Sequence, residues 1–201
     1  MTAAQERALH ALFPKYGIAF ADSPLRSPRN APLVLEIGSG MGETTAAIAA
    51  AQPHADFVAV EVHGPGVGSL LNRIEAQGLK NLRIVRHDAL EVLERMVEDG
   101  SLAAIHLFFP DPWPKKRHHK RRLVRAETAS LMARKLAPGG VLHAATDWPD
   151  YAQHIAAVLG AEPLLESARA GFASRPETKF EGRGKRLGHP IQDLYFRRRS
   201  G

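Results

Sequence analysis

The stretch LVLEIGSGMGETTAAIAAA, residues 33–51, decides the fold. Residues 33–40 form a mostly apolar run that ends in glycines, which is typical of a strand buried on both faces. The alanine-rich residues 41–51 that follow favour a helix. A buried strand that passes through a glycine turn into a helix is typical of an α/β protein.

The same order of strand and helix repeats along the rest of the chain. A helix at 121–136 is expected to stop before Pro138-Gly139-Gly140. Further strands, the last two of them joined by a long polar loop, are expected at 56–62, 81–89, 101–109, 141–147, 164–172 and 191–198. This alternation predicts an α/β fold with a mostly parallel, seven-stranded sheet and helices on both faces. We expect a single domain overall, with 1–32 as a short N-terminal helix or extension of the domain 33–201.

The composition limits the cellular compartments and the kinds of chemistry that are possible for this protein. No stretch approaches the roughly 18 apolar residues that a membrane-spanning helix needs, so we expect a cytoplasmic protein with no membrane contact. The chain has no cysteine, which excludes disulfides, iron–sulfur clusters and thiolate nucleophiles. His118 and His119 are adjacent and lack the spacing of a zinc motif, so no metal site is expected.

Acidic residues mark the ends of the predicted strands. In an open parallel sheet, ligands bind outside the carboxyl ends of the strands, so residues there are the first candidates for a site. Each acid taken alone could instead serve as a turn or helix-cap residue. Five strand ends that each supply a carboxylate favour a binding edge, and these acids are Glu36, Glu61, Asp88, Asp111 and Asp147.

The glycine turn after the first strand has the pattern E-x-G-x-G-x-G, formed by Glu36, Gly38, Gly40 and Gly42. A dinucleotide fingerprint would need a further glycine where Glu43 stands, so the match to an NAD site is incomplete. The pattern resembles the S-adenosylmethionine (SAM) site of class I methyltransferases. This resemblance implies that Glu36 and the glycines face the methionine part of the cofactor. A turn kept only for tight strand–helix packing is the alternative.

That resemblance also implies that Glu61 binds the ribose and that Asp88 binds the adenine amino group. If SAM is the cofactor, the missing cysteines exclude the usual route to pyrimidine C5 methylation and radical mechanisms. The methyl acceptor is then expected to be a heteroatom that is ready to react.

The stretch FFPDPWPKKRHHKRR, residues 108–122, combines a carboxylate, a proline-rich loop and a dense basic run. Asp111 follows a strand end, and the prolines at 110, 112 and 114 restrict the loop around it. Trp113 offers a face on which a nucleic-acid base could stack, although core packing is the commoner role of a tryptophan. The basic residues after it could hold the phosphates that flank the base.

The charge of the chain is segregated. Seven Lys or Arg and no acid lie in 115–125, five against two acids lie in 175–186, and three arginines occupy 197–199. Because the whole chain carries a formal charge of only +6, its remainder is net acidic. Basic patches on an acidic body favour a polyanionic partner, most simply nucleic acid, although a single run can be just a solvated loop.

Several motifs in the same order are similar to the bacterial tRNA (guanine-N7-)-methyltransferase family. They are FFPDPWPKKRHHKRR together with EVHGPGVG at 61–68, ATDWPDY at 145–151 and TKFEGRGKRLGHPIQDLYF at 178–196. The resemblance covers about residues 33–198 and implies a Rossmann-like class I fold, SAM as cofactor, and methylation of guanine 46 in the variable loop of tRNA. The segment before Leu33 is shorter than expected for the family.

The resemblance also assigns roles to residues of this chain. Asp111 is the residue credited with catalysis, and it joins Glu36, Glu61 and Asp88 in binding SAM. The substrate-contacting positions correspond to Lys115, Asp147, Thr178, Lys179, Phe180 and Glu181. The RNA-contacting run corresponds to Arg117, His118, His119, Lys120, Arg121 and Arg122.

Two alternatives stay open. An exocyclic amino methyltransferase would carry an Asp-Pro-Pro-Tyr motif, which Asp111-Pro112-Trp113 resembles only distantly because the second proline is absent. A non-catalytic RNA-binding protein with a vestigial nucleotide fold would bind tRNA but not SAM. The sequence leaves open whether the protein is a monomer or a homodimer.

Overall fold

The computed structural model describes residues 1–173, 175 and 190–200. The chain divides into two compact units, Met1–Glu98 with Ala173–Pro176, and Asp99–Phe172 with Glu177–Gly201. We call them the first and the second unit. The expected single-domain organisation stays a prediction, and residues 1–32 belong to the first unit.

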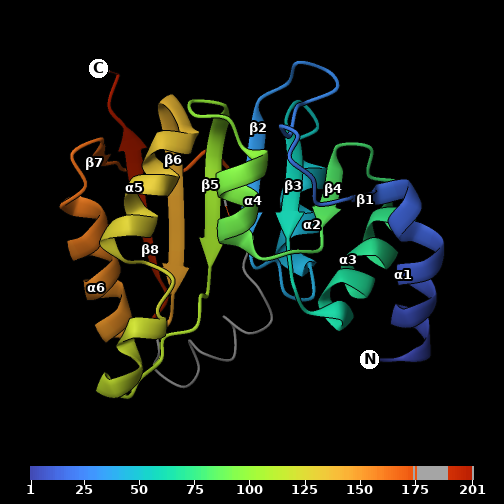
Figure 1. Ribbon diagram of the computed structural model, residues 1–201, viewed down its shortest axis with the longest axis horizontal. Coiled ribbons are helices and arrows are strands. Elements are labelled where there is room, and N and C mark those ends of the chain that lie inside the picture. The colour runs from blue at the N-terminus through green and yellow to red at the C-terminus, as the bar shows by residue number, and fades with distance from the viewer. Residues whose placement is uncertain (174, 176–189, 201) are drawn as a thin grey trace. The chain divides into compact units, whose positions relative to one another are not determined.

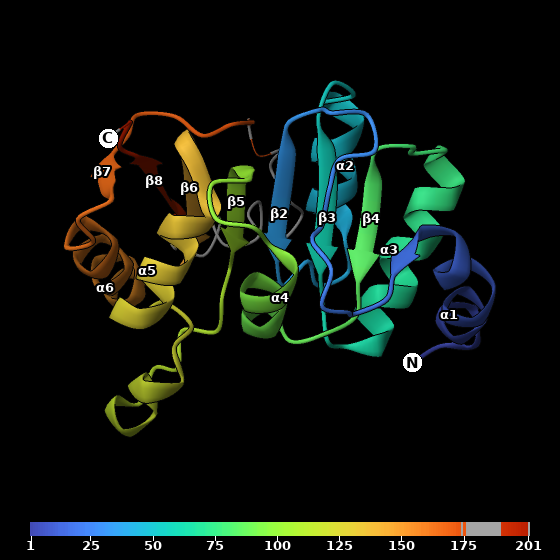
Figure 2. The ribbon, with the colours of Figure 1, turned by 45° about the horizontal axis from the view of Figure 1, so that its top comes forward.

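The first unit alternates helices and strands (Figure 1). Its elements are α1 (Ala3–Tyr16), β1 (Gly17–Ile18), β2 (Leu33–Ile37), α2 (Glu43–Ala51), β3 (Asp56–Val60), α3 (Gly64–Gln77), β4 (Leu82–Val85) and α4 (Ala89–Met96). The strands are parallel in the order β1-β4-β3-β2, and every residue of β2 and β3 is buried. Helices α2 and α4 lie on opposite faces of these strands (Figure 2).

The second unit contains β5 (Leu102–Phe108), the 3-10 helix η1 (Lys116–Arg121), α5 (Ala126–Lys135), β6 (Leu136–Thr146), α6 (Pro149–Gly160), β7 (Leu165–Ser167) and β8 (Gln192–Arg198). Strands β5 and β6 are parallel. Strand β8 lies between β6 and β7 and is antiparallel to both, so the parallel pattern ends in this part of the sheet.

Most predicted elements are confirmed within a few residues, but three expectations about the strands were wrong. Strand β6 begins at Leu136 instead of 141 and includes Pro138-Gly139-Gly140. The proline and glycines mark a register irregularity opposite β5, between Leu102 and Ala104, instead of a connection. The closing strand expected at 164–172 has only the three residues of β7. The part of the chain that the structure describes has eight strands, one more than expected, because the two-residue β1 gave no sequence signal.

The helix predicted at 121–136 was also too long. Helix α5 starts at Ala126, and most of the basic run before it forms η1. In the described ranges, no helix is both long and apolar enough to cross a bilayer.

Candidate active site

The glycine turn joins β2 to α2 through backbone conformations that favour glycine. Gly38, Gly40 and Gly42 have φ values of 74°, 55° and 75°. A Cβ at Gly38 or Gly40 would meet no atom within 4 Å, whereas one at Gly42 would lie 2.6 Å from Leu70 of α3. Gly42 therefore serves the packing of α2 on α3, and Gly38 and Gly40 leave exposed backbone that a ligand can approach without meeting a side chain.

Helix α3 approaches this turn closely. A Cβ at Gly66 would lie 2.4 Å from the carbonyl oxygen of Gly40, so the glycine of α3 allows the contact. The amide of Gly38 donates to the carbonyl of Val60 at the end of β3, at 2.9 Å. These contacts fix the turn against the strand and the helix that follow it.

Glu36 is a buried carboxyl group next to the turn. It is 3% exposed, and its Oε1 accepts a hydrogen bond of 2.9 Å from Thr45 of α2. Burial raises the pKa of Glu36 to about 7. Its Oε2 and the hydroxyl of the nearby Ser39 are buried without a hydrogen-bond partner among the described residues. Because buried polar atoms are rarely left unpaired, these two atoms fit a ligand that supplies donors beside the glycines.

Glu61, after β3, uses both carboxylate oxygens to hold the backbone. Its Oε2 accepts from the amide of Gly40 and its Oε1 from the amide of His63, each at 2.8 Å. The side chain therefore connects the glycine turn to the start of α3. Each oxygen keeps a second lone pair with which it can accept a ligand hydroxyl.

Asp88, after β4, has the helix-cap role that was the alternative explanation for a single acid. Its Oδ1 accepts from the amides of Leu90 and Glu91, at 2.9 and 3.2 Å, at the start of α4. Its side chain is exposed at the same strand edge as Glu36 and Glu61, since β2, β3 and β4 are parallel neighbours. The structure thus brings these three predicted residues to one edge of the first unit.

In the second unit, a strained loop follows β5. Phe109 and Trp113 have φ values of 51° and 44°, which non-glycine residues rarely adopt. The amide of Phe109 donates to the carbonyl of Ala145 on β6 at 2.7 Å. Strained residues of this kind cluster at functional sites, where the surrounding structure must hold them in place. We call residues 109–114 the acceptor loop.

Asp111 in the acceptor loop is exposed, and so is Asp147, which directly follows β6. Because Phe108 of β5 pairs with Ala145 of β6, the two aspartates leave neighbouring parallel strands at the same edge. Neither forms a hydrogen bond or an ion pair with a described residue.

Trp113 is half-buried and packs against η1 instead of the core of the unit. Its ring makes an edge contact with His118 at 5.9 Å between centroids, and the guanidinium of Arg121 lies 5.0 Å from the ring. The loop and the basic helix therefore form one structure.

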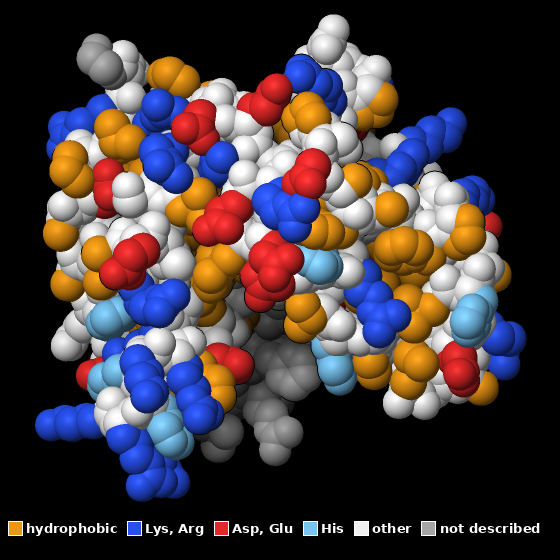
Figure 3. Space-filling view, in the orientation of Figure 1, with side chains coloured by type: hydrophobic (Ala, Val, Ile, Leu, Met, Phe, Trp, Pro, Cys, Tyr) orange, Lys and Arg blue, Asp and Glu red, His pale blue; other side chains and the backbone are white. Residues whose placement is uncertain are grey.

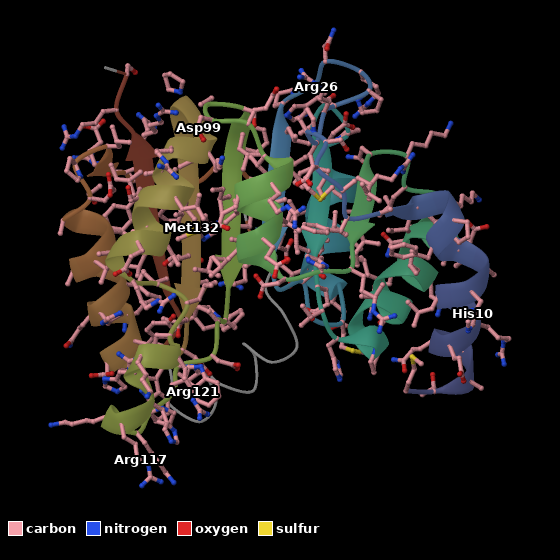
Figure 4. The ribbon with its side chains drawn as sticks, in the orientation of Figure 1. His10, Arg26, Asp99, Arg117, Arg121 and Met132 are labelled. Atoms are coloured by element: carbon pink, nitrogen blue, oxygen red, sulfur yellow. The ribbon has the colours of Figure 1, made fainter. Side chains whose placement is uncertain are left out.

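The basic run is at the surface except for one residue. Lysine and arginine side chains gather over η1 in Figure 3, and Arg117 and Arg121 project from it in Figure 4. Lys115 and the residues from Lys116 to Arg121 are exposed or half-buried. Arg122 is only 2% exposed and is paired with Asp150, so it does not match the expectation of an RNA contact.

Four predicted substrate-contacting residues lie outside the described residues: Thr178, Lys179, Phe180 and Glu181.

The sequence analysis missed two residues near the candidate site. They are Thr45, whose hydroxyl donates a hydrogen bond to Glu36, and Asp150, which forms an ion pair with Arg122. Thr45 follows the glycine turn by one helical turn, and this spacing could have indicated it. Nothing in the local sequence of Asp150 indicates its partner.

Comparison with known proteins gives the class of the fold. Residues 30–194 match the family model described as "Putative methyltransferase". The 16S rRNA methyltransferase KamB has a similar structure, with a TM-score of 0.60, 19% identity, and coverage of 87% of this chain and 95% of KamB. An rRNA methylase from Streptococcus thermophilus gives a TM-score of 0.57 and 15% identity over 84% of this chain and 87% of its own. The matching family model and the fold define a SAM-dependent methyltransferase of the Rossmann-like α/β class.

Curated relatives give the particular family. The tRNA (guanine-N(7)-)-methyltransferase of Nitrosomonas eutropha is 56% identical over an alignment of 201 positions that covers 96% of this chain and 90% of that protein. The protein of the same name from Aromatoleum aromaticum is 54% identical over 99% of this chain and 80% of its own length. The chain belongs to the tRNA (guanine-N(7)-)-methyltransferase family.

Proposed function

We propose that this protein transfers the methyl group of SAM to N7 of guanine 46 in the variable loop of tRNA, in the cytoplasm. One observation carries the proposal beyond family membership. Two exposed carboxylates, Asp111 and Asp147, follow neighbouring strands, and a basic 3-10 helix comes directly after the loop that holds the first of them. This arrangement suits an acceptor base whose flanking phosphates need positive charge.

The residues of the first unit fit the cofactor. When bound, SAM supplies an electrophilic methyl group on a sulfonium. The unpaired Oε2 of Glu36 and the open backbone of Gly38 and Gly40 suit the polar methionine end. Glu61 retains acceptor capacity for ribose hydroxyls, and exposed Asp88 can accept from an adenine amino group. Gly42 supports this site through packing alone.

The chemistry of the acceptor explains why the site needs carboxylates and no strong base. Guanine N7 has a free lone pair and no proton to lose. As N7 is alkylated, positive charge develops on the purine. Asp111 stabilises that charge and, with Asp147, can accept hydrogen bonds from the N1 and N2 donors of the base, which orients N7. Asp111 is in this sense the catalytic residue, and the family resemblance also counts it among the acids that bind SAM.

The substrate is held by positive charge beside the acceptor loop. We assign phosphate contacts to Lys115, Arg117, His118, His119, Lys120 and Arg121. Lys115 and the segment Thr178–Glu181 are proposed to contact the substrate near the base. Arg122, which the resemblance placed in the same run, is assigned no phosphate contact because its side chain is buried.

Nucleoside mass spectrometry tests the proposal. Unmodified tRNA transcripts are incubated with the protein and SAM, and the methylguanosine isomers are separated by chromatography. N7-methylguanosine that disappears when the variable-loop guanine is replaced supports both the reaction and its target.

A matched transcript with another guanine replaced controls for misfolding of the RNA. An N2-methylated product would favour an exocyclic amino methyltransferase. If no methylation occurs and equilibrium titration detects no SAM binding, the protein is a non-catalytic RNA-binding protein and the proposal is wrong.

A further inference from the structure

Arg122 is the exception in its basic run. Its side chain is 2% exposed and ranks among the largest fully buried side chains. It stands directly after η1, where its amide donates to the carbonyl of His119 at 3.0 Å. Placing a guanidinium inside a protein is costly unless its donors are satisfied, so its partners show what the burial achieves.

The partners of Arg122 belong to two other segments of the second unit. Its Nε donates to the carbonyl oxygen of Pro112 in the acceptor loop at 2.9 Å, and its Nη2 donates to Asp150 of α6. Its guanidinium also lies 4.8 Å from the ring centre of Tyr151, which is fully buried. The hydroxyl of Tyr151 accepts from the amide of Val124 at 3.4 Å, which holds the ring in place. One side chain thus connects the acceptor loop, the end of η1 and the start of α6.

The acceptor loop needs such an anchor. Its prolines at 110, 112 and 114 have no amide hydrogen, so half of its residues cannot donate a backbone hydrogen bond. Phe109 and Trp113, at each side of Asp111, hold positive φ values that relax unless the surroundings oppose them. The carbonyl of Pro112 directly follows Asp111, so the bond from Arg122 acts one residue from the carboxylate.

The other partner of Arg122 lies close to the second carboxylate. Asp150 is in the first turn of α6, three residues after Asp147. The bond to Arg122 holds the pKa of Asp150 below its usual range, so this carboxyl stays ionised. The planar guanidinium can bond the Pro112 carbonyl and the Asp150 carboxylate from separate nitrogens, which the single ammonium of a lysine cannot reproduce.

We propose that Arg122 is a positioning residue for the methyl transfer. It holds Asp111 and Asp147 in one fixed arrangement by tying the acceptor loop to the start of α6, and it does not contact RNA. This inference rests on the proposed function for the reaction that it serves.

The decisive variant is Arg122→Lys, which keeps the charge and removes the two-directional hydrogen bonding. The expected result is a fall in kcat of at least about 10-fold with an unchanged Kd for SAM, because 1.4 kcal/mol of misalignment corresponds to a factor of ten. The slope of log K for tRNA against log salt should stay at its wild-type value. A phosphate contact would also keep this slope, since lysine preserves the charge, but it would leave kcat at saturating tRNA near its wild-type value.

Arg29→Lys is the matched control. Arg29 also bonds a proline carbonyl, that of Pro53 at 3.1 Å, and a carboxylate, that of Asp56, but in the first unit at the start of β3. This variant should lose thermal stability without losing kcat, which separates a general effect of a broken arginine pair from an effect on the acceptor loop.

Asp150→Asn provides a second route if Arg122→Lys does not fold, because it keeps the shape of the partner and weakens the bond. Like Arg122→Lys, it should lower kcat. Hydrogen exchange of the backbone amides of Asp111 and Trp113 should become faster. Wild-type kcat in both Arg122→Lys and Asp150→Asn would overturn the inference. If the wild-type protein itself forms no N7-methylguanosine, the proposed function fails instead, and the exchange measurement still tests the anchoring.

Discussion

The glycine turn and the acceptor loop both depend on left-handed backbone, but they achieve it differently. The turn uses Gly38, Gly40 and Gly42, for which positive φ costs little. The acceptor loop places Phe109 and Trp113 in that region and is held by contacts with β6, η1 and Arg122. A glycine turn is ready for a ligand by its own conformation, whereas the acceptor loop is shaped by the residues around it. The first should therefore respond to changes in its own residues, and the second also to changes in its supports.

The largest expected effect comes from Asp111→Asn. It removes the charge that faces the developing cation and keeps the shape of the side chain, so kcat should fall by about 100-fold, as for the loss of one preorganised electrostatic group. SAM affinity should persist, because the glycine turn is untouched. Single-turnover kinetics and a SAM titration measure the two quantities, and wild-type turnover would remove Asp111 from the electrostatic role.

The second largest effect concerns Glu36, beside the glycine turn, whose protonation makes stability and SAM affinity depend on pH. Burial raises the pKa of Glu36 to about 7, above its usual 4.5. The folded protein therefore binds a proton that the unfolded chain has lost, and stability without ligand falls by about 1.4 kcal/mol per pH unit as pH rises from 4.5 to 7. Binding of a cationic ligand group favours the ionised form, so SAM affinity should rise by about 10-fold per unit as pH approaches 7 from below.

Isothermal titrations with SAM from pH 5.5 to 8 measure this dependence, with Glu36→Gln as the control. The glutamine variant has no carboxyl proton to lose, so both pH dependences should disappear at this position. A variant that keeps the full pH dependence would show that another group is responsible.

A smaller effect separates ligand contact from backbone strain within the turn. Gly40 and Gly78 have φ values of 55° and 61°, and a Cβ at either would meet nothing within 4 Å. Alanine at each should lower the free energy of unfolding by about 1 to 2 kcal/mol through the same left-handed strain. Only Gly40→Ala should also weaken SAM binding, because Gly78 ends α3 away from the turn. Equal SAM affinities in the two variants would mean that the turn is kept for packing alone.

The smallest expected effect concerns the phosphates. Arg117→Ala removes one exposed charge of η1, so the slope of log K for tRNA against log salt should become shallower by about 0.7 to 0.9. Filter binding at several salt concentrations measures it, and Arg122→Lys serves as the comparison with no expected change. An unchanged slope for Arg117→Ala would place the RNA elsewhere on the protein.

The sequence predicted the parts of this site that depend on periodicity and strand ends. Apolar runs located β2 to β5, and the parallel order then brought Glu36, Glu61 and Asp88 to one edge. The sequence did not predict the features of the site that depend on contacts between residues far apart in the chain. Nothing local distinguishes buried Arg122 from exposed Arg121, since the difference comes from Asp150 and Tyr151, which lie on another helix.

The errors in β6 and β1 have the same origin. Pro138-Gly139-Gly140 is a strong signal for a chain break, but pairing with β5 extends the strand back to Leu136 around an irregular register. Gly17–Ile18 is too short for any periodicity and becomes a strand only by pairing with β4. Asp88 is a helix cap, and it also lies at the strand edge where the cofactor is proposed to bind, so the two roles do not exclude each other.

The placement of β8 between β6 and β7 has a consequence for synthesis on the ribosome. The four strands of the first unit lie within residues 17–85, so they can pair while later segments are still being made. In the second unit, β6 and β7 have no strand between them until residues 192–198 emerge. Until then, the edges of both strands expose unpaired backbone groups that could pair with another nascent chain. The interval between translation of β7 and of β8 is therefore a stage at which the second unit is open to wrong strand pairing.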